Sequence, residues 1–135
     1  MSKILLVAAE PGSRERLRLA LERLEASGDE IEFLEADDGN VALAAAELEL
    51  PDLVVVEVGV TPYGAFGLTR DLKALPKVAC PVIVLLERDQ DEWLGRWSGA
   101  DALVYRPVDP FALAQVAGRL LAERAAGGTS GKAAS

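Results

Sequence analysis

Short apolar runs alternate with helix-spaced segments along the whole chain. Five runs rich in valine, isoleucine and leucine have the length of buried strands, and they lie at residues 3–8, 31–36, 53–58, 81–86 and 102–105. Between these runs apolar residues recur at helical spacing, most clearly from Leu17 to Leu24 and from Leu113 to Leu120. Such alternation predicts an α/β fold in which helices cover both faces of a parallel sheet.

The composition of the runs predicts where each strand lies in the sheet. The first, third and fourth runs are almost continuously apolar, which is typical of central strands buried on both faces. The second run carries Glu32 and Glu35, so we expect it at an edge. The last helix is expected to begin at Asp109-Pro110, a capping acid followed by proline at the first helical position.

The chain has the length of one domain. Its 135 residues, half of them hydrophobic, are enough for a single core and too few for two. We expect this domain to span residues 1–124. Residues 125–135 are small and polar without an apolar period, so burial cannot offset the entropy lost on ordering, and a disordered tail is expected.

Charge and composition disfavour several classes of function. A formal charge of −8 argues against nucleic acid as a partner, because phosphate backbones are bound by clustered Lys and Arg. Neither a membrane-spanning run nor a signal peptide is recognisable, so a cytoplasmic protein without membrane contact is expected. The absence of histidine and the single Cys80 disfavour Cys–His nucleophiles, ordinary zinc sites and most hydrolytic chemistry.

Candidate functional residues follow the carboxyl ends of the strands, where open parallel sheets bind their ligands. The residues expected at this edge are Ala8, Ala9, Glu10, Glu57, Leu86, Glu87 and Arg106. Glu57 comes directly after four apolar residues, so its carboxylate is expected to be half buried and to need a partner. Arg106 could supply one by gripping the carboxylate bidentately across two strand ends.

Four segments carry a resemblance to a known family: KILLVAAE, PDLVVVEVGVTPYGAFGLTRDLKA, PVIVLLERDQDEWLG and GADALVYRPVDPFALA. Together they resemble the receiver domain of two-component response regulators, from residue 3 to about residue 122. The GAD followed by Arg-Pro and an acidic cap is the most diagnostic part. The resemblance implies a flavodoxin-like (βα)5 three-layer sandwich with strand order 2-1-3-4-5.

The chain departs from this family at each position that the family uses. Typical members carry two Mg²⁺-binding acids after the first strand, a phosphoaccepting aspartate after the third, Thr or Ser after the fourth and Lys after the fifth. An aromatic residue in the fifth strand completes the switch. The resemblance places these features on Ala8 and Ala9, Glu57, Leu86, Arg106 and Leu103, respectively.

These departures predict that the usual phosphorylation chemistry is lost. Mg²⁺ needs oxygen ligands in near-octahedral geometry, and Ala8 and Ala9 offer only methyl groups, so we expect neither a metal site nor a cofactor. Phosphoryl transfer depends on positioning and electrostatic stabilisation, which the metal supplies in large part. Leu86 also lacks the hydroxyl that, in the family, moves toward the phosphoryl group and hydrogen-bonds to it.

Glu57 and Glu87 leave several interpretations open. The Glu57 carboxylate could be neutralised by Arg106, could stand in permanently for a phosphorylated aspartate, or could itself accept phosphate. Glu87 could crowd the pocket and compete for Arg106, or could be a solvated acid at the start of the fourth helix.

The aromatic residues predict an interaction surface. Trp93 and Trp97 lie four residues apart on the expected fourth helix and could form a surface with Leu103, Tyr105 and the fifth helix. The alternative is that one tryptophan packs into the core and only one is exposed.

The sequence therefore predicts a pseudo-receiver that is not an enzyme and signals through phosphorylation-independent contact with a signalling protein or a second copy. In the second case a homodimer would form through the fourth helix, fifth strand and fifth helix. Two rival functions remain: a response regulator phosphorylated at a non-standard site, and a flavodoxin-like cofactor binder or enzyme. For the second rival, the loop AAEPGSR is a poor phosphate cradle.

Overall fold

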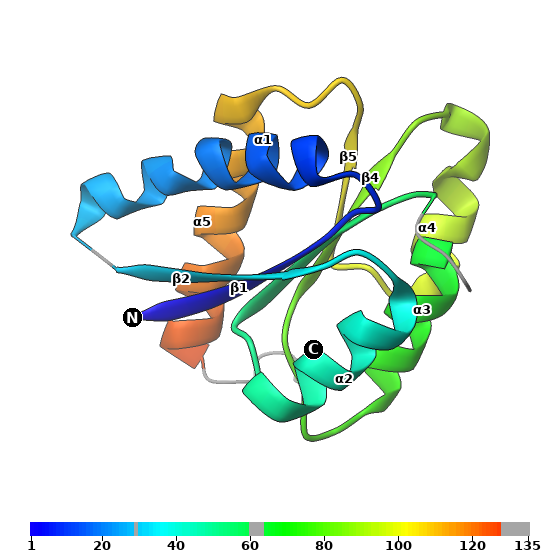
Figure 1. Cartoon of the computed structure of the whole chain (residues 1–135), viewed down its shortest axis with the longest axis horizontal. Helices are drawn as coiled ribbons and strands as arrows, with labels where there is room; N and C mark the ends of the chain where they lie inside the picture. Colours follow the sequence, from blue (N-terminus) through cyan, green and yellow to red (C-terminus); the bar gives the residue numbers. More distant parts are fainter. Residues whose placement is uncertain (29, 60–63, 128–135) are drawn as a thin grey trace.

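Five parallel strands form one sheet of order β2-β1-β3-β4-β5 in the computed structural model, which describes residues 1–28, 30–59 and 64–127 (Figure 1). The strands are β1 (Ser2–Val7), β2 (Ile31–Ala36), β3 (Leu53–Glu57), β4 (Val82–Leu86) and β5 (Ala102–Tyr105). The helices are α1 (Pro11–Leu21), α2 (Gly39–Glu49), α3 (Gly64–Ala74), α4 (Glu92–Ser98) and α5 (Pro110–Gly127), with short 3-10 helices η1 (Glu22–Ser27) and η2 (Asp89–Asp91). The predicted flavodoxin-like architecture and strand order are confirmed.

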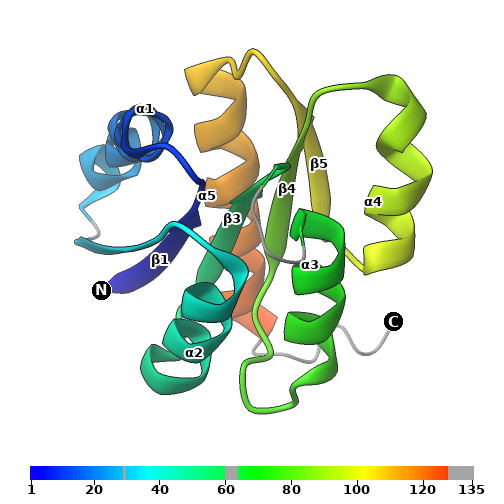
Figure 2. The ribbon, with the colours of Figure 1, turned by 45° about the vertical axis from the view of Figure 1, so that its right-hand side comes forward.

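Alternate residues of the central strands point to opposite layers. Leu5 and Val54, paired across β1 and β3, face the core beneath α2, α3 and α4, whereas the adjacent Leu6 and Val55 face the core beneath α1 and α5. The two layers are visible on either side of the sheet in Figure 2. All residues of β3 and β4 are buried, which is why these strands are apolar at every position except Glu57 at the end of β3.

The structure agrees with the expected edge strand and differs from the expected end of the domain. β2 lies at an edge of the sheet, as expected, and its Glu32 and Glu35 are exposed. α5 continues to Gly127, past residue 124 where the domain was expected to end. The rest of the expected disordered tail, residues 128–135, lies outside the described residues. Within the described part of the chain, none of the helices is both long and apolar enough to cross a membrane.

Two aspartates join neighbouring strands at the amino-terminal edge of the sheet. Asp52 accepts a hydrogen bond from the backbone N–H of Lys3 at 2.8 Å, and its other oxygen accepts one from Arg124 at 3.0 Å. Asp101 accepts from the backbone N–H of Val82 at 2.8 Å and from the Lys73 ammonium at 2.7 Å. Each carboxylate thus ties the start of one strand to the next, with a cation to balance its charge.

Candidate functional site

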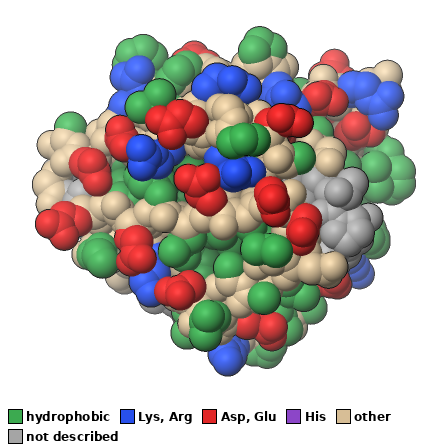
Figure 3. Space-filling model, viewed as in Figure 1, with side chains coloured by type: hydrophobic (Ala, Val, Ile, Leu, Met, Phe, Trp, Pro, Cys, Tyr) green, Lys and Arg blue, Asp and Glu red, His purple; other side chains and the backbone are tan. Residues whose placement is uncertain are grey.

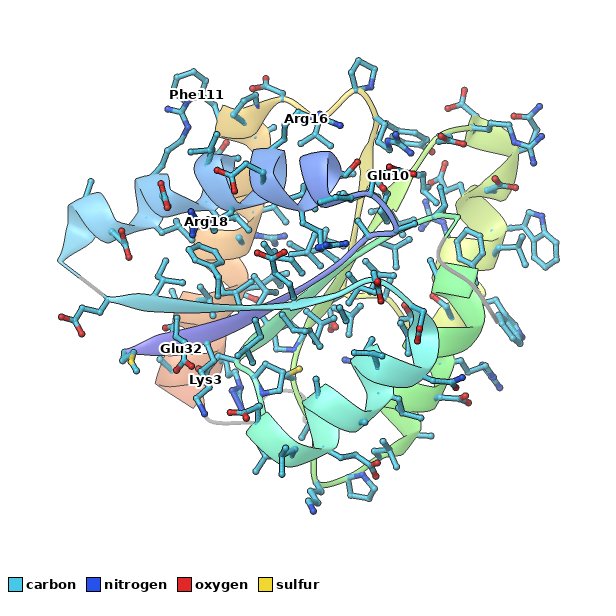
Figure 4. The ribbon with its side chains drawn as sticks, viewed as in Figure 1. Lys3, Glu10, Arg16, Arg18, Glu32 and Phe111 are labelled. Atoms are coloured by element: carbon cyan, nitrogen blue, oxygen red, sulfur yellow. The ribbon has the colours of Figure 1, made fainter. Side chains whose placement is uncertain are left out.

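The first two residues after β1, Ala8 and Ala9, place no acid at the carboxyl edge of the sheet. Ala8 is fully buried and its backbone N–H donates to Ala36, while Ala9 is exposed. Glu10 comes next and is exposed at the start of α1, where its carbonyl accepts from the amides of Ser13 and Arg14 (Figure 4). Its backbone thus begins the first turn of α1, and its side chain makes no capping hydrogen bond.

A guanidinium occupies the space beside this strand end. Arg14 donates from Nη1 to the carbonyl of Ala8 at 2.7 Å and to that of Ala9 at 3.5 Å. Its Nε donates to the Glu35 carboxylate at 2.8 Å, which fixes the arginine between β1 and β2. Our interpretation of the sequence missed Arg14. A basic residue one turn into the helix that follows β1 is the signal that could have found it.

Glu57 is buried at the end of β3, with 9% of its surface exposed. Arg106 at the end of β5 is its cationic neighbour, with Nε at 3.6 Å from a carboxylate oxygen. The same guanidinium donates from Nη1 to the exposed Glu87 carboxylate at 2.8 Å. The expected bidentate grip of Arg106 on Glu57 is therefore wrong in its geometry, because the guanidinium is divided between two acids and its hydrogen bond goes to Glu87.

Leu86 lies between these charged groups without contributing a polar side chain. It is fully buried in the core beneath α2, α3 and α4, and its carbonyl accepts from the backbone N–H of Arg106 at 2.8 Å. The Arg106-Pro107 peptide bond that follows is cis. Leu86 thus fastens β5 to β4 through its backbone, and the side chain at the hydroxyl position is part of the core.

The residues at this edge do not fit a magnesium ion. Mg²⁺ is bound through carboxylate, carbonyl and water oxygens, but Arg14 covers the Ala8 carbonyl and Arg106 covers Glu57 and Glu87. Both guanidinium groups are paired with acids, Arg14 with Glu35 and Arg106 with Glu57 and Glu87, so the oxygens at this edge are already engaged. Across residues 1–28, 30–59 and 64–127 there is no group of three acidic, cysteine or histidine side chains that could hold a metal ion.

The tryptophans form an exposed pair on α4. Trp93 is 66% exposed and Trp97 is 49% exposed, so the alternative in which one packs into the core is wrong. Arg70 of α3 lies over the Trp97 ring, 4.4 Å from its centroid, and donates to the Trp97 carbonyl at 2.9 Å. Leu103 is half buried, and a Cβ built on Gly95 would lie 2.6 Å from one of its methyl carbons. Leu103 therefore supports α4 from below.

Tyr105 extends this surface from β5. Its hydroxyl donates to the Glu92 carboxylate at 3.1 Å, and Arg96 pairs with the same carboxylate. Hydrogen bonds from Arg96 and Tyr105 lower the pKa of Glu92. Desolvation, followed by its hydrogen bond to the Glu92 carboxylate, raises the pKa of Tyr105. The contact connects β5 to the tryptophan-bearing helix.

Comparison with known proteins identifies relatives in signalling. The chain is 32% identical over 120 residues to an uncharacterized response regulatory protein of Mycobacterium tuberculosis, spanning 88% of this chain and 90% of that protein. It is 31% identical over 125 residues to Protein PilH of Pseudomonas aeruginosa, spanning 90% and 99%. A putative response regulator from Chloroflexus aurantiacus shares the fold with a TM-score of 0.79 at 22% identity, over 90% and 98% of the two chains. No protein-family profile matches the chain.

Proposed function

The chain belongs to the receiver domain family of response regulators, and we propose that it is a pseudo-receiver that signals by protein–protein contact without Mg²⁺-dependent phosphorylation. In this proposal it is a cytoplasmic binding module and not an enzyme. The single observation that carries it is the pair of guanidinium groups, from Arg14 and Arg106, at the strand ends where the family's metal chemistry takes place.

The charge distribution supports this proposal more strongly than the loss of two acids alone. A receiver that merely lacked the acids would leave a neutral hollow into which a cation and its water ligands could still enter. Here Arg14 donates to the carbonyl of Ala8, the residue that follows β1. Arg106 in turn neutralises Glu57, the one acid at the phosphoacceptor position. A divalent cation would have to displace both arginines and leave them close to its own charge.

Of the three interpretations of Glu57, pairing with Arg106 has the most support. A carboxylate that stood in for a phosphoryl group would need a mobile hydroxyl to attract, and Leu86 is an apolar side chain locked in the core. A carboxylate that accepted phosphate would need an activating cation, which the neighbouring charges disfavour. A buried acid within 3.6 Å of a guanidinium needs neither.

The interaction surface in this proposal is the exposed face formed by Trp93, Trp97 and Tyr105. Aromatic side chains supply large contact area at low conformational cost and are enriched where binding energy concentrates. Arg70 and Glu92 already hold Trp97 and Tyr105 in place, so these side chains lose little conformational freedom on binding. The partner would be another signalling protein or a second copy of this chain.

Phosphorylation is tested directly by incubating the protein with acetyl phosphate, or with beryllofluoride, in the presence of Mg²⁺. Intact mass and amide chemical shifts are then measured. We expect no stoichiometric adduct and no shift change at Glu57 or Leu86. A stoichiometric adduct on Glu57 would replace this proposal with that of a working response regulator at a non-standard site. A preparation that carries bound nucleotide or flavin would favour the cofactor-binding rival.

The surface is tested with the double variant Trp93→Glu/Trp97→Glu in sedimentation and light scattering. We expect the variant to lose self-association, or binding to an identified signalling partner, because two charges would be buried at the contact. Leu48→Glu on α2 is a matched control, since Leu48 is an exposed apolar residue on another helix. Equal behaviour of the double variant and the wild type would remove α4 from the proposed surface.

A further inference from the structure

A cavity of about 450 Å³ opens between α1 and the connection from β5 to α5. Its walls are mostly apolar and include Leu17 and Ala20 of α1 on one side and Val108 on the other. Glu57 and Arg106 also line it, so it adjoins the site at the strand ends. Its volume lies within the roughly 300–1,000 Å³ that small-molecule sites occupy.

Two arginines on the rim of the cavity have no acidic partner. Arg16 and Arg23 both line it, and neither has a carboxylate within 4.0 Å among the residues that the structure describes. The Arg16 guanidinium donates only to the Ser13 hydroxyl, at 3.2 Å, and the Arg23 guanidinium lies over the Phe111 ring, 4.2 Å from its centroid. Most of the other arginines pair with acids, as expected in a chain with a formal charge of −8.

The cavity therefore has a local excess of positive charge. Arg106 is balanced by Glu57 and Glu87, which leaves the charges of Arg16 and Arg23 available to a ligand. The two arginines lie seven residues apart on one side of α1 and η1, with Ala20 between them. Basic and apolar side chains adjoin along the upper edge of the face in Figure 3, and Figure 4 places Arg16 and Phe111 along that edge.

Phe111 adds an apolar side chain next to this charge. It is 68% exposed at the first turn of α5, where its backbone N–H donates to the Asp109 carboxylate at 3.0 Å. Its ring is held beneath the Arg23 guanidinium. A planar apolar group could thus stack beside Phe111 while its anionic group meets the guanidinium.

We propose that this cavity binds a small organic anion, with its apolar body against Leu17, Ala20 and Val108 and its oxyanion group on Arg16 and Arg23. The volume of the cavity favours a small molecule over an acidic peptide, which would need a long groove. The site is separate from the surface of Trp93 and Trp97, so it does not depend on the function proposed above. Because Glu57 and Arg106 line the same cavity, a bound anion would also contact the strand-end site.

The test uses two fluorescent probes that share a ring system and differ in charge: anilinonaphthalene sulfonate and neutral phenylnaphthylamine. We expect saturable one-to-one binding of the sulfonate to the wild type. Each charge-assisted contact contributes on the order of tenfold in affinity, so Arg16→Gln/Arg23→Gln should weaken sulfonate binding by about 100-fold. Binding of the neutral probe should change by less than about twofold.

Arg119→Gln is the matched control, because Arg119 is an exposed arginine of α5 that does not line the cavity and has no acidic partner among the described residues. It should leave the affinity for the sulfonate unchanged, as should Trp93→Glu/Trp97→Glu. In amide spectra the sulfonate should shift Ala20 and Val108 and leave the two indole N–H signals in place.

Three results would overturn the proposal. The first is a double arginine variant that binds the sulfonate as tightly as the wild type. The second is a set of shifts centred on Trp93 and Trp97. The third is binding of an acidic amphipathic peptide at Arg16 and Arg23 when the sulfonate does not bind, which would make this a protein-docking surface.

Discussion

The two edges of the sheet use carboxylates in opposite ways. At the amino-terminal edge, Asp52 and Asp101 each accept one hydrogen bond from a backbone N–H of the neighbouring strand and one from a cationic side chain, at distances between 2.7 and 3.0 Å. At the carboxyl edge, Glu57 has a guanidinium at 3.6 Å, and no backbone amide among the described residues donates to it. The acids of the first edge hold strands together, whereas the acid of the second is only neutralised.

This difference shows which edge is structural and which could change its chemistry. A backbone N–H that loses its acceptor inside a protein is costly, so Asp52 and Asp101 themselves should tolerate little substitution. Glu57 fastens no strand, so the residues around it can change without breaking a contact between strands. The carboxyl edge is thus where function can be lost or replaced without unfolding the domain.

The largest effect is expected from Asp101→Ala. The buried N–H of Val82 would lose its acceptor and Lys73 its partner, so the free energy of unfolding should fall by about 2–3 kcal/mol. Urea denaturation measures this. Asp101→Asn keeps an acceptor for Val82 and should recover more than half of the loss. If Ala and Asn cost the same, the ion pair and not the strand clamp stabilises this edge, and the contrast between the edges disappears.

A smaller loss is expected from Arg106→Ala at the other edge. Glu57 would remain buried without its cation, so we expect the free energy of unfolding to fall by about 1–2 kcal/mol. Adding Glu57→Gln should restore most of it, because the amide needs no counter-charge. Glu87→Ala is the matched control: it removes the shorter but exposed pair, which should contribute less than about 0.5 kcal/mol.

Comparing the stability lost in Arg106→Ala with that lost in Glu87→Ala tests whether Glu57 needs its counter-ion. If Arg106→Ala is no more costly than Glu87→Ala, burial of the carboxylate does not require the guanidinium. Glu57 would then be free for another role, and the pairing with Arg106 would be wrong.

The third prediction concerns Cys80, which lies among the ions of the amino-terminal edge. Burial raises the pKa of its thiol from 9.0 to about 11. Above pH 9 the unfolded chain loses this proton and the folded chain keeps it, so stability that is complete below pH 9 falls as the pH approaches 11. The loss should be about 1 kcal/mol between pH 9 and 10. The urea midpoint of the wild type should therefore fall more steeply with pH over this window than the midpoint of Cys80→Ala. Parallel plots of midpoint against pH would contradict the prediction.

Most of the fold could be predicted from the sequence because strand burial leaves a direct pattern. The runs at β1, β3 and β4 are almost continuously apolar since both faces are covered, and the ends of the strands fall within one residue of the expected bounds. The end of α5 could not be placed, because helical propensity continues through an alanine-rich segment after the apolar period stops.

The candidate site could be predicted only where a strand end fixes a position. Ala8, Glu57, Leu86 and Arg106 were expected at the carboxyl edge, and the structure brings them there. Arg14 was not expected, since nothing local shows that a helix residue reaches back to a strand carbonyl. The division of Arg106 between two acids likewise depends on side-chain positions that strand spacing does not determine.

The smallest expected effect is that of magnesium itself. A metal that binds only the folded state stabilises it according to its affinity, and at about 10 mM Mg²⁺ a site with a dissociation constant above 10 mM adds less than about 0.4 kcal/mol. We expect a shift no larger than this in the wild type, because Arg14 and Arg106 adjoin the position. Ala9→Asp/Arg14→Gln adds a carboxylate and removes a cation, so it should respond to Mg²⁺ more than the wild type does, and Ca²⁺ should serve as a comparison ion. If the wild type is already stabilised by more than 1 kcal/mol, corresponding to a site of at least about millimolar affinity, the carboxyl edge binds metal despite its arginines. The contrast between the two edges would then lie in hydrogen bonding alone and not in charge.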